Sequence, residues 1–305
     1  MSRAVVFTEY GDPDVLRVVD AEIPRPGTGQ VRVRVKAAGL QPFDSLFRSG
    51  KAAQFVPATF PQRLGNEVAG VVDAVGAGVT YFAVGDEVLG PVMLAALAEH
   101  ALADADQLVI KPENMPWEEA GALSASGQTA HASLRQLGVS EGDTVLIHAA
   151  AGGVGSLAVQ IAKAWGATVI GTASERNHDY LRSLGAIPVA YGEGLTDRVR
   201  AVAPGGVDAS LDGVATEDSL RSAIELVEDP ARLGVVAFNP LAMRLGVQRL
   251  STERSAGRLA ELTSLYEQGK LRVTVHKTFS LEQTPDAQRE VEGGHVRGKV
   301  VVTVD

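Results

Sequence analysis

The sequence contains no cysteine, and this absence excludes several kinds of chemistry. Disulfide bonds, thiolate nucleophiles, Cys-ligated zinc and iron–sulfur clusters all need a cysteine sulfur. No apolar run approaches the length of about 18 residues that a transmembrane helix needs. The first ten residues have the pattern of a strand, without the basic start and apolar core of a signal peptide. We therefore expect a cytoplasmic protein.

Positive charge is also scarce. The chain has 28 Lys and Arg against 37 Asp and Glu, which gives a formal net charge of −9 and a pI of about 5.2. A surface of this sign repels phosphate backbones, so nucleic acid is not expected as a partner. The hydrophobic content of 45% and the length of 305 residues are ordinary for a globular protein of two domains.

The first part of the chain is rich in short strand patterns. Residues 31–36 alternate between valine and a charged residue, as a half-buried strand does. Further Val-rich runs cover residues 4–7, 16–19, 67–75 and 86–89, with glycine and proline between them. Regular short strands separated by turn residues predict an antiparallel barrel or sandwich.

The pattern changes after about Trp117. Residues 117–137 are expected to be mostly helical. Strands over 144–149, 168–172, 187–191, 207–211 and 234–238 alternate with helical segments. This alternation predicts βαβ units and a parallel sheet. In the tail we expect a helix over 251–268 and strands over 271–275 and 299–304. The tail is closer in pattern to the first part, so we expect it to return to the first domain.

A glycine-rich segment lies between a predicted strand and a predicted helix. Ala150-Ala151-Gly152-Gly153-Val154-Gly155 fits the pattern G-x-G-x-x-G with alanine at the first glycine. In that pattern Gly152 lets the backbone approach a pyrophosphate, and Gly155 lets the helix pack close to the strand. The helix N-terminus then offers N–H groups to the phosphates. The alternative is an ordinary glycine-rich turn, but the flanking elements favour a dinucleotide site.

The end of the second strand of this region bears on which dinucleotide binds. NAD sites usually place Asp or Glu there, on the ribose 2′-OH. Ser174 takes that place here, and Arg176 follows two residues later. A guanidinium pairs well with a 2′-phosphate, so NADP(H) is favoured. Two alternatives stay open: Glu175, one position further on, can hold the ribose of NAD, and Arg176 can be a solvated charge.

Several motifs together resemble those of the medium-chain dehydrogenase/reductase superfamily, in its zinc-free quinone oxidoreductase (zeta-crystallin-like) branch. The similarity extends over almost the whole chain. The motifs are Gln41-Pro42-Phe43-Asp44, Arg48-Ser49-Gly50, Gly65-Asn66-Glu67, Gly85-Asp86-Glu87, Gly127-Gln128-Thr129, Ala150 to Gly155, Leu184-Gly185-Ala186 and Gly298-Lys299.

The resemblance implies an α/β fold in two parts, with the active site in the cleft between them. A doubly wound parallel Rossmann sheet is joined to a GroES-like β-barrel. The expected division is a GroES-like substrate and catalytic domain over 1–118, a Rossmann NADP-binding domain over 119–248, and a C-terminal return to the GroES-like domain over 249–305. The implied activity is NADPH-dependent reduction of a small-molecule quinone or of an activated C=C bond, as in an enone.

The resemblance also implies which residues lie along NADP(H). By position they are Thr129, Gly152, Gly153, Val154, Ser174, Arg176, Asn177, Tyr191, Gly213, Val214, Phe238 and Asn239. Asn177 stands about where related enzymes often carry a lysine for the 2′-phosphate.

A metal site is not expected. Zinc-dependent relatives use a catalytic cysteine and a Gly-His-Glu run, and this chain has Asn66 where that histidine would stand. Zinc-activated alcohol oxidation is therefore not expected, because nothing would polarise the alkoxide. A tyrosine that relatives often carry near the substrate is also missing, since Lys51-Ala52-Ala53 stands there. A preference for quinones does not carry over.

Without a metal, hydride transfer depends on positioning the nicotinamide against an electron-poor acceptor. Hydrogen-bond donors near the acceptor carbonyl would stabilise the developing charge. Gln41 and Arg48 are candidates, together with Asp44. Asp44 and Arg48 are four residues apart, so they can instead pair on a helical turn, and we favour this structural role.

Two further functions stay open. One is an enoyl-type reductase of a biosynthetic pathway, with a larger or thioester substrate. The other is a non-catalytic NADPH-binding protein, since fold alone does not fix function. A homodimer is expected by analogy, with the segment 245–250 as the sheet edge that pairs between subunits.

Overall fold

The computed structural model describes residues 1–237, 239–251 and 253–304. The chain divides into two compact units. Unit 1 consists of Met1–Ala125, Arg254–Thr263 and Val273–Asp305, and unit 2 consists of Ser126–Glu253 and Ser264–Arg272. Both ends of the sequence therefore belong to unit 1, and each unit is described by itself.

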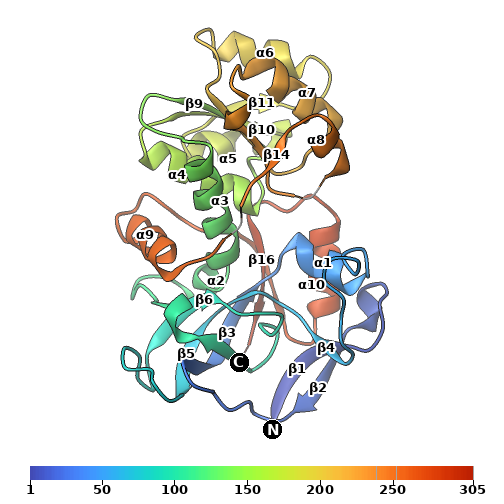
Figure 1. The fold of residues 1–305 in the computed structure, drawn as a ribbon, viewed down its shortest axis with the longest axis vertical. Coiled ribbons are helices and arrows are strands. Elements are labelled where there is room, and N and C mark those ends of the chain that lie inside the picture. The colour runs from blue at the N-terminus through green and yellow to red at the C-terminus, as the bar shows by residue number, and fades with distance from the viewer. Residues whose placement is uncertain (238, 252, 305) are drawn as a thin grey trace. The chain divides into compact units, whose positions relative to one another are not determined.

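Unit 1 is built from two sheets (Figure 1). The smaller has the order β2-β1-β4, from Arg17–Ala21, Ser2–Phe7 and Gln62–Arg63. The larger has the order β15-β16-β3-β5-β6-β8, and β7 also pairs with β3. Its strands are β3 (Gln30–Gly39), β5 (Glu67–Val75), β6 (Glu87–Pro91), β7 (His100–Asp104), β8 (Val109–Ile110), β15 (Val275–Ser280) and β16 (Lys299–Thr303).

Strand β3 is the central element of unit 1. Val31, Val33 and Val35 are buried in its core, and Arg34 on the other face is exposed, so the predicted alternation is confirmed. Antiparallel pairing joins β3 to β5, β7 and the C-terminal strand β16. The tail therefore returns to the first part of the chain through this strand. The helices of unit 1 include α1 (Pro42–Arg48), α2 (Trp117–Ala120) and α10 (Thr284–Glu292).

Unit 2 has one six-stranded parallel sheet in the order β11-β10-β9-β12-β13-β14 (Figure 1). The strands are β9 (Thr144–His148), β10 (Thr168–Ala173), β11 (Ile187–Ala190), β12 (Ala209–Asp212), β13 (Leu233–Val235) and β14 (Gln248–Arg249). Its connecting helices are α4 (Gly153–Ala164), α5 (His178–Ser183), α6 (Leu195–Val202), α7 (Glu217–Leu226) and α8 (Pro240–Arg244). This strand order is that of a doubly wound dinucleotide-binding sheet, so the predicted fold class is confirmed.

Residues 117–137 are mostly helical, as predicted, and form two helices, α2 and α3 (Ser124–Gln136), that are separated by a turn. The turn begins at Gly121, whose carbonyl oxygen accepts a hydrogen bond of 2.8 Å from Gly39 N of β3. A Cβ at Gly121 would lie 2.6 Å from the carbonyl oxygen of Ala37. The close approach to β3 thus interrupts the helix. The tail helix α9 (Ala256–Glu267) is also shorter than predicted.

The predicted strand over 271–275 is wrong. Leu271 and Val273 are buried, as in a strand, but residues 271–274 belong to no strand, and their contact with β16 is made at the last of them, where Thr274 O accepts from Lys299 N (2.9 Å). Side chains take the hydrogen bonds instead: Arg272 N donates to Gln160 Oε1 (2.9 Å), and Val273 N donates to Glu119 Oε2 (3.2 Å). The strand of this region is β15, which begins at Val275.

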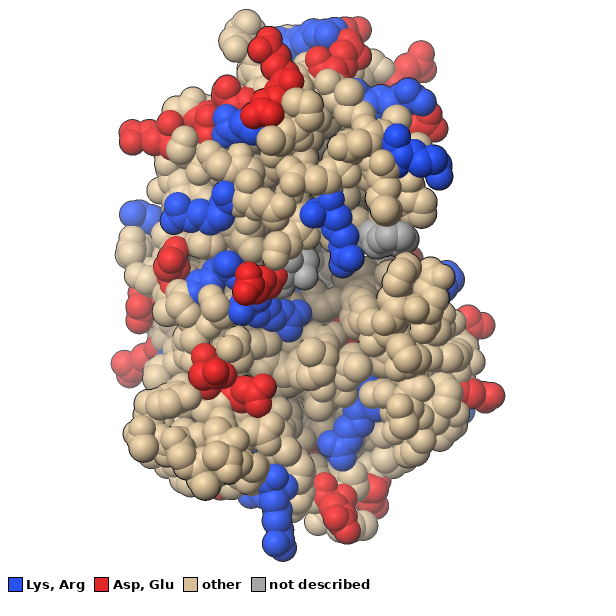
Figure 2. All heavy atoms as spheres, viewed as in Figure 1, with Lys and Arg blue, Asp and Glu red and all other residues tan. Residues whose placement is uncertain are grey.

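The surface carries charges of both signs. On the face shown in Figure 2, Lys and Arg side chains lie among Asp and Glu side chains. Among the described residues, no helix is long and apolar enough to cross a membrane.

Candidate active site

Strands β9 and β12 mark the point where the order of the sheet in unit 2 reverses, with β10 and β11 on one side and β13 and β14 on the other. In open α/β sheets, ligands bind outside the carboxyl ends of the strands at such a point. Most of the predicted cofactor residues follow these strand ends. Gly152 to Val154 follow β9, Ser174 to Asn177 follow β10, Tyr191 follows β11, Gly213 and Val214 follow β12, and Asn239 follows β13. The parallel strands thus bring five separate segments to one edge.

The glycine-rich segment forms a tight turn between β9 and α4. Ala149 has a φ of 54°, and Ala150 N donates a 3.0 Å hydrogen bond to Thr172 O of β10. A Cβ on Gly155 would lie 2.3 Å from the carbonyl oxygen of Ala149, so α4 packs as close to the strand as the pattern predicts. A Cβ on Gly152 would meet only that same oxygen, at 3.4 Å. Packing within the protein requires glycine at position 155 but not at 152, which leaves room at Gly152 for a pyrophosphate.

The residues after β10 lie at the same edge. Ser174 precedes the short 3-10 helix Glu175–Asn177, and Asn177 Nδ2 donates to Ser174 Oγ (3.3 Å). Arg176 is exposed, and so is Glu175. An uncharged Ser174 next to an exposed guanidinium suits a 2′-phosphate, while the exposed carboxylate of Glu175 keeps the NAD alternative open.

The residues after β12 and β13 are held by side-chain hydrogen bonds. Asp212 Oδ1 accepts from the backbone N–H groups of Val214 (2.8 Å) and Ala215 (2.7 Å). Asn239 Nδ2 donates to Ala215 O (2.8 Å), and its Oδ1 accepts from Leu241 N (2.8 Å) at the start of α8. The Asn239 side chain is therefore engaged locally. Phe238, also predicted to line the cofactor, lies outside the described residues.

Two further predicted cofactor residues, Thr129 and Tyr191, differ in exposure. Thr129 is half-buried on α3, and Tyr191, directly after β11, is 63% exposed. Contact of any of these twelve residues with NADP(H) stays a prediction.

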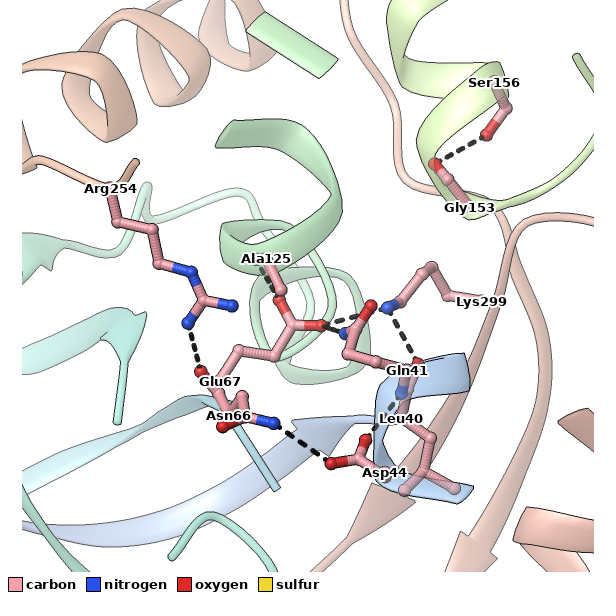
Figure 3. A network of polar contacts seen from close by, with 10 residues as sticks. All are labelled: Leu40, Gln41, Asp44, Asn66, Glu67, Ala125, Gly153, Ser156, Arg254 and Lys299. Carbon is pink, nitrogen blue, oxygen red and sulfur yellow. Dashed lines mark hydrogen bonds and ion pairs between the residues drawn. The ribbon is translucent and has the colours of Figure 1, made fainter. Parts of the chain in front are cut away.

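In unit 1 a buried polar network surrounds Glu67, the first residue of β5 (Figure 3). Glu67 Oε1 accepts from Lys299 Nζ at 3.0 Å and from Gln41 Nε2, and Oε2 accepts from Ala125 N at 2.7 Å. Lys299 Nζ also donates to Leu40 O (2.9 Å). Glu67 is 0% exposed and Lys299 4%, so this ion pair is withdrawn from water. The network fixes the side-chain amide of Gln41 at the start of α1.

Asp44 forms a second part of this network. Its Oδ2 accepts from Gln41 N (2.7 Å) and its Oδ1 from Asn66 Nδ2 (3.1 Å). Burial raises the pKa of the Asp44 carboxyl from 3.8 to about 6, although the hydrogen bond from Gln41 N and the charge of Lys299 oppose the shift. Arg254 Nη1 donates to Asn66 O (2.8 Å) from the start of the tail segment (Figure 3).

Arg48 lies in a different environment. It is 1% exposed, and its guanidinium donates to Gln288 Oε1 (2.7 Å), to Gly11 O and to Glu292 of α10. The expected pairing of Asp44 with Arg48 is therefore wrong, because each side chain has other partners. Arg48 fastens α1 to α10, and a fully enclosed guanidinium is a structural group.

No group of three or more His, Asp or Glu side chains in the described part of the chain is arranged to hold a metal ion. At the position of the zinc-ligating histidine of relatives, the amide of Asn66 binds Asp44 instead.

Glu67 and Lys299 stand within the family motifs named above, but the sequence predicts a role for neither. They lie 232 residues apart, so no local spacing signals the pair. The only available signal was that each is a charged residue beside valine-rich strand sequence.

The comparisons with known proteins agree with this architecture. Residues 27–113 match the model of the alcohol dehydrogenase GroES-like domain, and residues 184–302 match the model of the zinc-binding dehydrogenase family. The GroES-like prediction is thus confirmed.

Individual relatives extend over the whole chain. The quinone oxidoreductase of Pseudomonas aeruginosa is 35% identical over 332 residues, covering 99% of each chain. The structure of CurK enoyl reductase has a TM-score of 0.89 at 27% identity, covering 100% of this chain and 99% of that one. The structure of mycobacterial Rv1454c complexed with NADPH has a TM-score of 0.86 at 29% identity, covering 99% of this chain and 100% of that one. The chain therefore belongs to the medium-chain dehydrogenase/reductase superfamily of oxidoreductases, in its quinone oxidoreductase branch.

Proposed function

We propose that this protein is a zinc-independent, NADPH-dependent oxidoreductase that reduces quinones or activated C=C bonds such as those of enones. The observation that carries the proposal is the turn after β9, where Gly152 leaves space that packing within the protein does not need. The similarity to a P. aeruginosa quinone oxidoreductase and to a structure complexed with NADPH supports it.

In this proposal the carboxyl edge of the sheet in unit 2 holds the cofactor. Backbone N–H groups at the start of α4 face the pyrophosphate, and Ser174 and Arg176 receive the 2′-phosphate. Gly213 and Val214 lie beside the cofactor at the end of β12. The chemistry that NADPH supplies when bound is hydride donation.

The candidate group for the acceptor is the amide of Gln41 in unit 1. Glu67 and Lys299 hold the amide of Gln41, and Asp44 holds its backbone N–H. We propose that this amide donates a hydrogen bond to the acceptor carbonyl oxygen, which gains negative charge as the hydride adds to the conjugated system. Asp44 acts through Gln41 as a positioning residue. Arg48 is left out of the catalytic group because its guanidinium is enclosed.

Titration of the purified protein with NADPH and with NADH tests the cofactor assignment. Gly152→Ala is the sharpest variant, because the added methyl group enters the open space without displacing protein atoms. We expect NADPH binding to weaken at least about tenfold with an unchanged unfolding temperature, since one lost charged hydrogen bond or close approach is worth about 1.5–3 kcal/mol. Gly257→Ala on α9, where a Cβ meets nothing within 4 Å, is the matched control. Unchanged NADPH affinity in Gly152→Ala would contradict the site.

Turnover with 1,4-benzoquinone and with a simple enone, followed by cofactor absorbance, tests the reaction. Turnover of either acceptor supports the reductase assignment. A second candidate is an enoyl-type reductase with a thioester substrate, which the similarity to CurK enoyl reductase favours. Turnover of an enoyl thioester alone would select it. NADPH binding with no turnover of any of these acceptors would select a non-catalytic binding protein.

Three further expectations remain proposals. The domain division at 118/119 and 248/249 is tested by limited proteolysis. A homodimer joined along the segment 245–250, which contains the edge strand β14, is tested by the mass in solution. A cytoplasmic location is tested by cell fractionation.

A further inference from the structure

Ala215 has an unusual backbone conformation. Its φ is 55°, in the left-handed region that alanine seldom occupies, and its side chain is 4% exposed. A left-handed conformation is unfavourable for alanine but not for glycine, so the surrounding structure must hold it.

Two side chains bind the backbone of Ala215, one at its N–H group and the other at its carbonyl oxygen. Asp212 Oδ1 accepts from Ala215 N (2.7 Å), and also from Val214 N (2.8 Å). Asn239 Nδ2 donates to Ala215 O (2.8 Å). Asp212 is itself fixed, because it is 2% exposed and its Oδ2 accepts from Ser219 Oγ (2.6 Å). Both the N–H and the C=O of the strained residue are therefore bound by side chains at the ends of β12 and β13.

The turn held in this way lies at the switch point of the sheet. It follows β12, the direct neighbour of β9, at the edge where ligands of such sheets bind. Val214 is 50% exposed there, and a Cβ on Gly213 would meet only ordinary contacts, the nearest being His148 O at 3.4 Å. Gly213 is half-buried and the Val214 side chain is exposed, while Ala215 next to them is buried.

We propose that Asp212 and Asn239 are positioning residues for cofactor binding: they lock Ala215 in its left-handed conformation and so fix the Gly213–Val214 backbone against the nucleotide. This inference rests on the proposed function, because it takes NADPH to be the ligand at this edge. It gives Asn239 a role through Ala215 rather than through its own contact with the nucleotide.

The test uses Asn239→Ser in the full-length chain. Serine is a good helix N-cap and keeps α8 capped, but it is too short to reach Ala215 O. Without that bond the turn can relax to negative φ, so we expect NADPH to bind about tenfold more weakly, in line with the left-handed penalty. Asp229→Ser, which changes the N-cap residue of the 3-10 helix Pro230–Arg232, is the matched control and should leave binding unchanged.

A rescue variant separates positioning from a general loss of structure. Glycine occupies positive φ without penalty, so Ala215→Gly in the Asn239→Ser background should restore the NADPH affinity to within about threefold of the original. Ala215→Gly alone should leave the affinity nearly unchanged. In the ligand-free protein, amide hydrogen exchange of Val214 and Ala215 should be faster in Asn239→Ser.

The outcomes distinguish this inference from the proposed function. Failure of the unmodified protein to bind NADPH would overturn the proposed function, and this inference with it. Normal binding by the unmodified protein together with unchanged affinity in Asn239→Ser, or with weakened affinity that Ala215→Gly does not restore, would overturn the inference alone.

Discussion

Replacing Lys299 by methionine should destabilise unit 1 strongly. The ammonium group lies 3.0 Å from Glu67 Oε1 and 2.9 Å from Leu40 O, and the two side chains of the ion pair are 4% and 0% exposed. Methionine fills a similar volume but leaves the carboxylate of Glu67 buried without its counter-charge. Breaking a buried pair in this way costs about 3–5 kcal/mol of unfolding free energy.

The neutral double variant should recover much of this loss. In Lys299→Met with Glu67→Gln no charge of the pair remains buried, and the amide oxygen of the introduced glutamine can still accept from Ala125 N, while Gln41 Nε2 loses its acceptor, so the recovery is incomplete. Lys277→Met is the matched control, because Lys277 pairs with Glu290 at 3.4 Å while 54% exposed. A surface pair of this kind contributes about 0–1 kcal/mol.

Fluorescence can follow each unit separately, because the chain has two tryptophans. Trp117 belongs to unit 1 and Trp165 to unit 2. In a Trp165→Phe background, urea unfolding followed by emission reports on unit 1, and linear extrapolation gives the unfolding free energy. The reasoning fails if Lys299→Met costs no more than Lys277→Met, or if the double variant is no more stable than Lys299→Met.

Three further predictions concern individual residues. Because the pKa of Asp44 is raised to about 6 from 3.8, its contribution to stability is present below about pH 4 and is lost as the pH rises through 6. The unfolding free energy of the unmodified protein minus that of Asp44→Asn should therefore fall by about 2 kcal/mol from pH 4 to pH 7, and a pH-independent difference in urea titrations would contradict this. Gly155→Ala places a methyl group 2.3 Å from Ala149 O, so unit 2 should lose about 1–3 kcal/mol, measured by Trp165 emission in a Trp117→Phe background, with Gly205→Ala of the same unit, where a Cβ meets nothing within 4 Å, as the control. Arg176→Ala should weaken NADPH binding about tenfold, the value of one charged hydrogen bond, and leave NADH binding unchanged; an equal loss for both nucleotides would refute the 2′-phosphate assignment.

The sequence predicts those features of the fold that depend on neighbouring residues. Gly155 is an example, since its close packing follows from a strand, a turn and a helix that are consecutive in the chain. The alternation over residues 31–36 likewise fixes which side of β3 is buried. Both predictions need only the local periodicity of strands and helices.

Features that depend on distant partners were missed or wrong. The i, i+4 rule predicted a pair of Asp44 with Arg48, but the partners of Arg48 are Gln288 and Glu292 on α10, more than 200 residues away. The extended segment 271–274 has the burial pattern of a strand, yet side chains rather than a strand bind its amides. No local rule specifies where such partners come from. The hydrogen bonds to Ala215 from Asp212 and Asn239 are also not predictable locally, because the two residues lie at the ends of different strands.

The position of β16 has a consequence for how the protein is made. This strand pairs with β3 and carries Lys299, so the larger sheet of unit 1 and the counter-charge of Glu67 depend on residues that are synthesised long after β3 and β5. The main segment of unit 2, Ser126–Glu253, emerges before them. During translation, β3 therefore has an unpaired edge, and the carboxylate of Glu67 has no counter-charge, until β16 has been synthesised. A nascent chain stalled just short of residue 299 should bind chaperones that the released protein does not.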